Sequence, residues 1–293
     1  MLELDAVTVI VLVAVSLVAG AAGGLLGISG AVVTVPGMTL VNAAAPLSRA
    51  ASLVVNVAIG LSGAIRHHQA RCFLPRVFGL MLLGGLVGGG AGTLLARHLD
   101  RWTWVFPGVF AVFLAYVIVL NLRLLAERRW DTEVHFTSDA PYPLTPRRVG
   151  ALLGVGFPMG LLAGLLGIGG GVLAVPLQQT LVDMPLRNAI ACSSATIVGI
   201  CAAAAFAAIT LGAGGSTPVF AWWQPLVVSA VLIPGGVIGA RVGAHFTHRL
   251  PLRTVRVAFV VVVTFGCFKM AQQSAQLYRK ASQATATQEA RPR

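Results

Sequence analysis

Charged side chains are scarce in this sequence. Only 10% of its 293 residues are Asp, Glu, Lys or Arg, whereas 57% are hydrophobic and the mean hydropathy is +0.85. A soluble domain carries about 25% charged residues, so this chain lacks the polar side chains needed to cover a water-exposed surface. The composition therefore excludes an ordinary soluble protein and predicts an all-α, polytopic membrane protein whose main solvent is lipid.

Acidic residues are scarcer than basic ones, nine against 21, and none lies in a predicted membrane span. An intramembrane metal site, a carboxylate proton relay or a catalytic cluster would need such groups. We therefore expect no metal, no cofactor and no catalytic residue, and we expect the chain not to be an enzyme. The net charge of +12 would suggest a nucleic-acid partner in a soluble protein. Here the basic residues lie between apolar runs, so we interpret them as topological signals and expect no nucleic acid.

Long stretches without any charged residue cover most of the chain, at 6–48, 50–65, 77–96, 102–122, 149–182 and 188–240. A helix needs about 20 apolar residues to cross a bilayer. We therefore predict eight transmembrane helices, the first and fifth followed by broken, re-entrant segments that run to about 41 and 182. The predicted spans are 7–25, 50–66, 77–96, 104–124, 149–166, 188–211, 223–245 and 255–275.

One long polar stretch, 125–148, divides the chain into a first transmembrane repeat, 1–124, and a second, 149–275. The tail 276–293 is rich in Ala, Gln, Ser and Thr, and we predict it to be disordered. With eight spans, both termini and the linker lie on one side, which holds thirteen basic residues against seven on the other. The positive-inside rule then places both termini in the cytoplasm, with the chain in a bacterial inner membrane.

An internal repeat connects the two halves. The segment Gly24–Pro36 recurs as Gly164–Pro176 at an offset of 140 residues, and a second series of three glycines recurs at an offset of 151. Two landmarks in the same order indicate duplication and fusion. Four spans per half would make the halves parallel, and counting the broken segment as a crossing would invert them; the sequence leaves this open. The glycines of the second series are Gly85, Gly88 and Gly92, matched by Gly236, Gly239 and Gly243.

The repeated motif should break the helix that carries it. Glycine weakens a helix by about 1 kcal/mol relative to alanine, and proline removes a backbone donor. Broken backbone inside a membrane is tolerated only in packed protein or along a water-filled cavity, so two matched breaks predict a binding site near the midplane. The N–H groups at half-helix N-termini would suit an anion. Alternatively, glycines serve close helix packing, which we prefer for Gly84/Gly88 and Gly239/Gly243.

The sequence resembles the sulfite exporter TauE/SafE family, also called the toluene sulfonate uptake permease family. The resemblance covers nearly the whole chain. It rests on Gly-Ile-Gly-Gly-Gly at 167–171 with Val-Pro at 175–176, on Ala-Ile-Ala-Cys-Ser at 189–193, and on Gly236–Gly243 followed by Arg-Leu-Pro at 249–251. The first copy of the motif departs from the family pattern, since Ser29 and Ala31 replace two glycines. The resemblance implies a transporter of sulfite, sulfonates or related organosulfur or carboxylate anions.

Polar residues inside the predicted spans are candidates for substrate binding, because such groups are costly in lipid. Gln178 and Gln179 follow the second Val-Pro directly. The alternative for the uncharged residues is hydrogen bonding between helices or to their own helix, and for Arg241 it is snorkelling to the interface. The full set of candidate substrate-binding residues is Gly27, Ser29, Gly30, Thr39, Ser52, Asn56, Gly169, Gly170, Gly171, Gln178, Gln179, Ser193, Thr196 and Arg241.

These features predict a permease that moves small anions by alternating access between its two repeats. Its expected partners are a small anionic substrate and the lipid bilayer, and a homo-oligomer stays open. Two other classes compete with transport. One is a membrane assembly protein without flux, and the other is an intramembrane enzyme, which the absence of an acid–base cluster in the spans disfavours.

Overall fold

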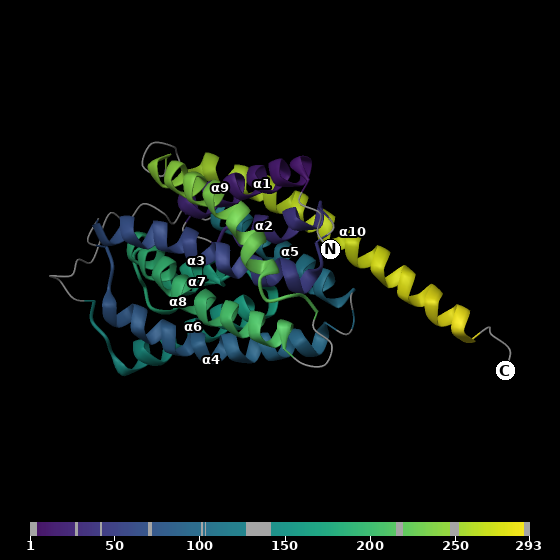
Figure 1. Ribbon diagram of the computed structural model, residues 1–293. Helices are drawn as coiled ribbons and strands as arrows, with labels where there is room; N and C mark the ends of the chain where they lie inside the picture. The colour runs from purple at the N-terminus through teal and green to yellow at the C-terminus, as the bar shows by residue number, and fades with distance from the viewer. Residues whose placement is uncertain are drawn as a thin grey trace.

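The computed structural model describes residues 5–26, 29–41, 43–69, 72–100, 102, 104–126, 142–214, 219–246 and 252–289. Within these ranges the chain forms ten helices and no strand, which confirms the predicted all-α class. The first five helices belong to the first repeat and the last five to the second. In chain order they are α1 (Ala6–Leu26), α2 (Ala31–Thr39), α3 (Ala45–Gln69), α4 (Pro75–Leu99), α5 (Val105–Ala126), α6 (Pro146–Leu166), α7 (Gly171–Leu181), α8 (Leu186–Ala213), α9 (Gln224–Phe246) and α10 (Leu252–Glu289) (Figure 1).

Seven of the described helices are long and apolar enough to cross a membrane: α1, α3, α4, α5, α6, α8 and α9. They correspond to seven of the eight predicted spans. The eighth, 255–275, lies within α10, several of whose side chains are outside the described part of the chain. The described helices are those of a polytopic membrane protein.

The two polar segments differ from their predictions. α10 continues to Glu289 and projects beyond the bundle (Figure 1), where a disordered tail was expected from 276. Its last turns are rich in alanine and glutamine, which favour helix, and they extend a helix that the apolar turns have already nucleated. In the expected linker, α6 begins at Pro146, with Thr145 as its N-cap. Residues 127–141 lie outside the described residues.

Each half of the chain contains the predicted break, and both breaks precede the prolines of the repeated motif. The second break lies between α6 and α7, at Gly167–Gly170. In the first repeat, Ser29 and Gly30 precede α2, and residues 27 and 28 are outside the described part. Pro36 and Pro176 both lie inside the short helices that follow.

The short helices fold back on the helices before them. A Cβ added at Gly30 would lie 2.9 Å from the carbonyl oxygen of Ala19, and one at Gly37 would lie 2.2 Å from the side chain of Val15. α2 therefore runs antiparallel to α1. The second repeat has the equivalent contact, Gly170 against Met159, at the same offset of 140 residues. Both segments are therefore re-entrant, as predicted.

The two repeats are inverted relative to each other. Their equivalent third helices, α3 and α8, pack side by side in opposite directions. A Cβ added at Gly60 would touch Ser194, Ile197 and Val198, whereas one added at Gly63, about one turn further along α3, would touch Ser194 and neither of the two later residues. The relative direction of the two repeats, which the sequence left open, is therefore inverted. In transporters with inverted repeats, the binding site lies between the repeats.

The repeats also exchange helices. The first helix of each repeat packs against the fourth helix of the other, α1 on α9 and α4 on α6. These contacts are backbone to backbone: a Cβ added at Gly20 would lie 2.0 Å from the carbonyl oxygen of Gly236, and one at Gly88 would lie 2.0 Å from that of Phe157. The glycines interpreted above as packing sites, Gly84, Gly88, Gly239 and Gly243, all lie in these two contacts.

The termini and the linker lie at opposite ends of the bundle. α1 runs parallel to α9, since Gly20 faces Gly236 and Gly24 faces Ala240. α10 returns from the end of α9, so it ends beside the start of α1; we call this the terminal end, on the right in Figure 1. Because the repeats are inverted, α6 begins at the other end, which we call the linker end.

The predicted placement of both termini and the linker on one side is therefore wrong. α3 runs parallel to α9, since Ser229 donates a hydrogen bond to the carbonyl of Ala51 and Gly236 lies against Ile59. α3 thus begins at the terminal end, as α1 does. Each short helix and the segment after it carry the chain back through the bundle. A count of full-length apolar runs misses this extra passage. As a result, every loop between the first and the second break lies on the opposite side of the membrane from the predicted one.

Candidate functional site

The two breaks meet at the middle of the bundle, on either side of α3. The Ser29 hydroxyl donates a hydrogen bond of 2.8 Å to Oδ1 of Asn56. On the other side, Nδ2 of Asn56 and the hydroxyl of Ser52 donate to the carbonyl of Gly167, at 3.4 and 3.2 Å. A Cβ added at Gly169 would lie 3.2 Å from the Ser29 hydroxyl, so the breaks also touch each other. We call Ser29, Ser52, Asn56, Gly167 and Gly169 the break junction; its three polar side chains are buried.

The second break needs glycine at three positions. Gly167, Gly169 and Gly170 have φ angles of 75°, 65° and 67°, in the left-handed region that other L-residues rarely adopt. The first break turns differently, because Gly30 has a φ of −62°. Among the described non-glycine residues only Asp183 has a positive φ, so Ser29 stands in an ordinary conformation. This difference explains why the first copy of the motif tolerates residues other than glycine.

The start of each short helix presents backbone donors. The N–H of Ala31, the first residue of α2, donates to the Ser29 hydroxyl at 3.2 Å. In α7, Leu173 and Ala174 both donate to the carbonyl of Gly170. The first N–H groups of a helix lack partners within the helix and carry partial positive charge. Because α2 and α7 begin directly after the breaks, this charge lies at the breaks.

One cation lies beside the junction, and the sequence reasoning missed it. Arg49 is three residues before Ser52 and seven before Asn56, and this spacing places all three on one face of α3. A Cβ added at Gly167 would lie 3.0 Å from Cα of Arg49. Because Arg49 falls at the edge of an uncharged run, it was counted only as a loop charge. The helical spacing to Ser52 and Asn56 was the signal that could have found it.

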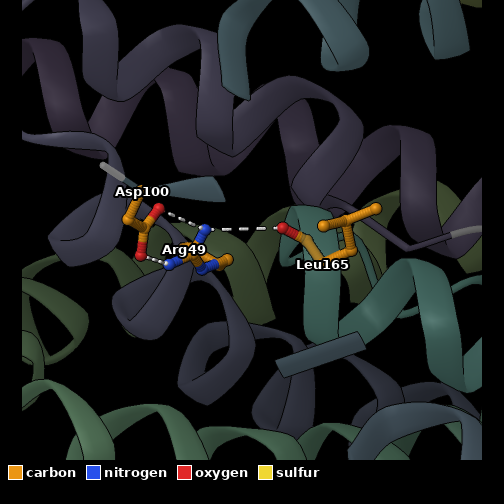
Figure 2. A network of polar contacts seen from close by, with 3 residues as sticks. All are labelled: Arg49, Asp100 and Leu165. Atoms are coloured by element: carbon orange, nitrogen blue, oxygen red, sulfur yellow. Dashed lines mark hydrogen bonds and ion pairs between the residues drawn. The ribbon is translucent and has the colours of Figure 1, made fainter. Parts of the chain in front are cut away.

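Arg49 contacts Asp100, Leu165 and Phe106 at the terminal end, and Figure 2 shows the first two of these contacts. Its guanidinium forms an ion pair with Asp100, the C-cap of α4, with Nη2–Oδ2 at 2.6 Å and Nη1–Oδ1 at 3.1 Å. Nη1 also lies 3.5 Å from the carbonyl oxygen of Leu165 in the last turn of α6. The guanidinium stands 5.4 Å from the ring centre of Phe106 in α5. The side chain of Arg49 is 7% exposed and that of Asp100 is 21% exposed, so the pair is largely shielded from water.

A second polar group lies toward the linker end, between α7 and α8. Nε2 of Gln178 donates to the carbonyl of Ala174 at 3.1 Å and to that of Ala189 on α8 at 3.4 Å. Ser193 stands one turn further along α8 and, like Gln178, is fully buried. The hydroxyl of Thr196 donates to the carbonyl of Cys192 in its own helix.

The remaining predicted residues are not brought to the junction by any described polar contact. Thr39 bonds to its own helix at the carbonyl of Pro36, Gln179 is half-buried, and Arg241 is exposed on α9. Gly30 and Gly170 cap the short helices, and Gly171 begins α7. Gly27 lies outside the described residues. No group of three His, Cys, Asp or Glu side chains that could hold a metal occurs in the described part of the chain.

The linker-end terminus of α7 is held by the segment before α6. The hydroxyl of Tyr142 donates to the carbonyl of Val182, and the N–H of Met184 donates to the carbonyl of Gln178 at 3.1 Å. Burial raises the pKa of the Tyr142 phenol, which keeps it in the protonated form that can donate. Arg148 stands 4.8 Å from the ring centre of Tyr142. The second re-entrant helix is thus anchored at both its ends.

Comparison with known proteins identifies a family. The model of the family described as "Sulfite exporter TauE/SafE" matches residues 12–270. The "Probable membrane transporter protein MamO" of Magnetospirillum gryphiswaldense is 29% identical over an alignment of 280 residues, which covers 87% of this chain and 43% of that protein. MamO of Paramagnetospirillum magneticum is 28% identical over an alignment of 287 residues, which covers 88% of this chain and 44% of that protein. The chain therefore spans less than half the length of these two relatives.

A third relative has a similar length. The "Probable membrane transporter protein YunE" of Bacillus subtilis is 25% identical over an alignment of 276 residues, which covers 88% of this chain and 96% of that protein. No solved structure matches the chain.

Proposed function

This chain belongs to the sulfite exporter TauE/SafE family, and we propose that it is a membrane permease that moves small anions, such as sulfite, sulfonates or related carboxylates, by alternating access. The observation that carries the proposal is the junction of the two breaks. Ser29 from one inverted repeat and Gly167 from the other share Asn56 at the centre of the bundle. In inverted-repeat transporters the substrate site lies at this level, formed by interrupted helices.

The chemistry of the junction suits an anion. The starts of α2 and α7 supply partial positive charge, and the Ser29, Ser52 and Asn56 side chains carry donors that can turn to substrate oxygens. Arg49 supplies a full positive charge next to Gly167. An anion at the junction would compete with Asp100 for this guanidinium, so the ion pair would hold the terminal end closed until substrate arrives. The buried junction corresponds in this proposal to an occluded state.

A flux measurement tests the proposal. We expect vesicles containing the purified chain to take up labelled sulfite or a sulfonate faster than empty vesicles. Replacing Asn56 with alanine should lower this flux at least tenfold, because Asn56 bonds to both breaks. Asn121→Ala is the matched control, since Asn121 on α5 bonds only within its own helix, to Val117. Equal flux in vesicles with and without the protein would contradict the proposal and favour a protein without flux. Equal loss of flux in both variants would contradict the placement of the substrate site at the break junction.

We further propose that the linker end faces the cytoplasm of a bacterial inner membrane. Arg76, Arg123, Arg147, Arg148 and Arg187 adjoin the helix ends there, and short cytoplasmic segments are enriched in Lys and Arg. The terminal end has four such residues, Arg97, the paired Arg49, and Arg279 and Lys280 in the C-terminal half of α10, against these five. Both termini would then lie outside the cytoplasm, opposite to the expectation from the sequence.

Impermeant thiol labelling of intact cells checks this orientation. Arg97 and Arg147 are exposed at opposite ends of the bundle, so each can be replaced singly by cysteine. We expect Arg97→Cys to react in intact cells and Arg147→Cys to react only after lysis. The reverse pattern would place the termini in the cytoplasm. The unsubstituted chain, in which Cys72, Cys192 and Cys201 are buried, gives the background.

A further inference from the structure

Two buried side-chain atoms between α7 and α8 have no hydrogen-bond partner in the described part of the chain. They are Oε1 of Gln178 and Oγ of Ser193, and both side chains are fully buried. An unsatisfied buried polar atom destabilises a folded protein, so such atoms are rare in native structures. Two of them on facing helices are an independent sign of a ligand site, separate from the break junction.

The geometry fixes which atom of Gln178 faces this site. Its Nε2 bonds to the carbonyls of Ala174 and Ala189, two acceptors that would repel Oε1 if the amide were turned over. Oε1 is therefore held away from both carbonyls, ready to accept. Ser193 lies one turn beyond Ala189 on α8, and side chains four residues apart on a helix have Cβ atoms about 5–6 Å apart. Gln178 and Ser193 therefore belong to one small polar site.

The two atoms select the chemistry of the ligand. Oε1 of Gln178 can only accept a hydrogen bond, whereas the Ser193 hydroxyl can donate or accept. A fully ionised sulfonate or a sulfite dianion offers only acceptors and leaves Oε1 unsatisfied. A monoprotonated oxyanion offers both an O–H donor and acceptor oxygens.

We propose that Gln178 and Ser193 form a subsite for a small oxyanion that still carries a proton, such as hydrogensulfite. The O–H of the ligand donates to Oε1 of Gln178, and one of its oxygens accepts from the Ser193 hydroxyl. This inference rests on the proposed anion transport and adds the protonation state of the substrate. In this proposal the substrate itself carries the proton across the membrane, in keeping with the lack of Asp and Glu in the predicted spans.

The subsite occurs in one repeat only. At the offset of 140 residues, the position of Gln178 in the first repeat holds Met38, which is fully buried and apolar. At the same offset the position of Ser193 holds Leu53, which is also fully buried and apolar. Proton-bearing substrate is thus recognised on the linker-end side of the junction. Gln178→Met introduces the residue of the other repeat and keeps a similar side-chain volume.

A binding measurement on the purified full-length chain tests the subsite without requiring flux. Thermal unfolding is followed with sulfite at mildly acidic pH, where it carries one proton, and at alkaline pH, where it has lost that proton. Methanesulfonate, which has no O–H at either pH, is the comparison ligand. We expect stabilisation by sulfite at acidic pH, about tenfold weaker apparent binding in Gln178→Met and Ser193→Ala, and no change in Thr180→Ala. Thr180 is exposed on α7 and bonds to its own helix.

Three results of these measurements would overturn the proposed subsite. Equal losses of sulfite and methanesulfonate binding in the variants, wild-type binding of sulfite in Gln178→Met, or no stabilisation of the wild type by sulfite at acidic pH would each overturn it. We also expect Gln178→Met without ligand to unfold at a temperature no lower than the wild type, because it removes an unsatisfied acceptor. Selective binding without flux would leave the subsite in place and reject the transport function, so the two failures are distinguishable.

Discussion

Replacing Arg49 with methionine is expected to lower the yield of folded protein more than any other single charge change at the terminal end. The substitution leaves the partly buried carboxylate of Asp100 without its cationic partner. Breaking a largely buried ion pair by removing one member destabilises a protein by about 3–5 kcal/mol. Asp100 is 21% exposed, so we expect the lower part of this range. Arg97→Met, at an exposed position of α4, should have little effect.

A double variant separates the structural role of Arg49 from its role in transport. Arg49→Met combined with Asp100→Asn removes both charges and should restore much of the folded protein, since no unpaired charge remains. Flux should nevertheless stay at least tenfold below the wild type, because no cation is left beside Gly167. The measurements are the amount of monodisperse protein in detergent and uptake into vesicles. Wild-type flux in the double variant would confine Arg49 to holding α3, α4, α5 and α6 together.

Replacing Gly170 with alanine is expected to be the most destabilising glycine substitution in the repeated motif. Its φ of 67° is unfavourable for alanine by about 1–2 kcal/mol. The added Cβ would also lie 2.3–2.6 Å from backbone atoms of Met159, which no rotamer change can move. Overpacking of this kind adds about 1–3 kcal/mol. We therefore expect a total loss of roughly 2–5 kcal/mol and a large fall in the thermal unfolding midpoint.

Two other glycines give a graded comparison. Gly30→Ala, at the equivalent position of the first repeat, should cost less, because its φ is −62° and its closest backbone contact, with Ala19, is 2.9 Å. Gly154→Ala should have almost no effect, since nothing lies within 4 Å of the added Cβ. The expected order of midpoints is Gly154→Ala highest, then Gly30→Ala, then Gly170→Ala. Equal loss at Gly30 and Gly170 would contradict the asymmetry of the two breaks.

The sequence by itself determined the class of the protein and the place of its breaks. Runs of uncharged residues longer than about 20 can only be solvated by lipid, where the backbone must satisfy its own hydrogen bonds. These helices can therefore be predicted without knowledge of how they pack. The 140-residue repeat marked both breaks, because consecutive glycines lack the conformational restriction that keeps a helix intact. Ser52 and Asn56 were found for the same local reason: polar groups are expensive in an apolar run. Local composition carries all of this information.

The tertiary structure alone decided how these parts meet. The sequence predicted re-entrant segments but could not show which residues α2 and α7 fold back against, because the contacts of Gly30 with Ala19 and of Gly170 with Met159 are tertiary. That return passage inverted the repeats and moved the termini away from the linker. It also placed Arg49 between Asp100 and Gly167, residues 51 and 118 positions away. Helix formation and solvation by lipid depend on neighbours in the chain, so they can be predicted from the sequence. Distances between side chains on different helices depend on how all the helices pack, so they required the tertiary structure.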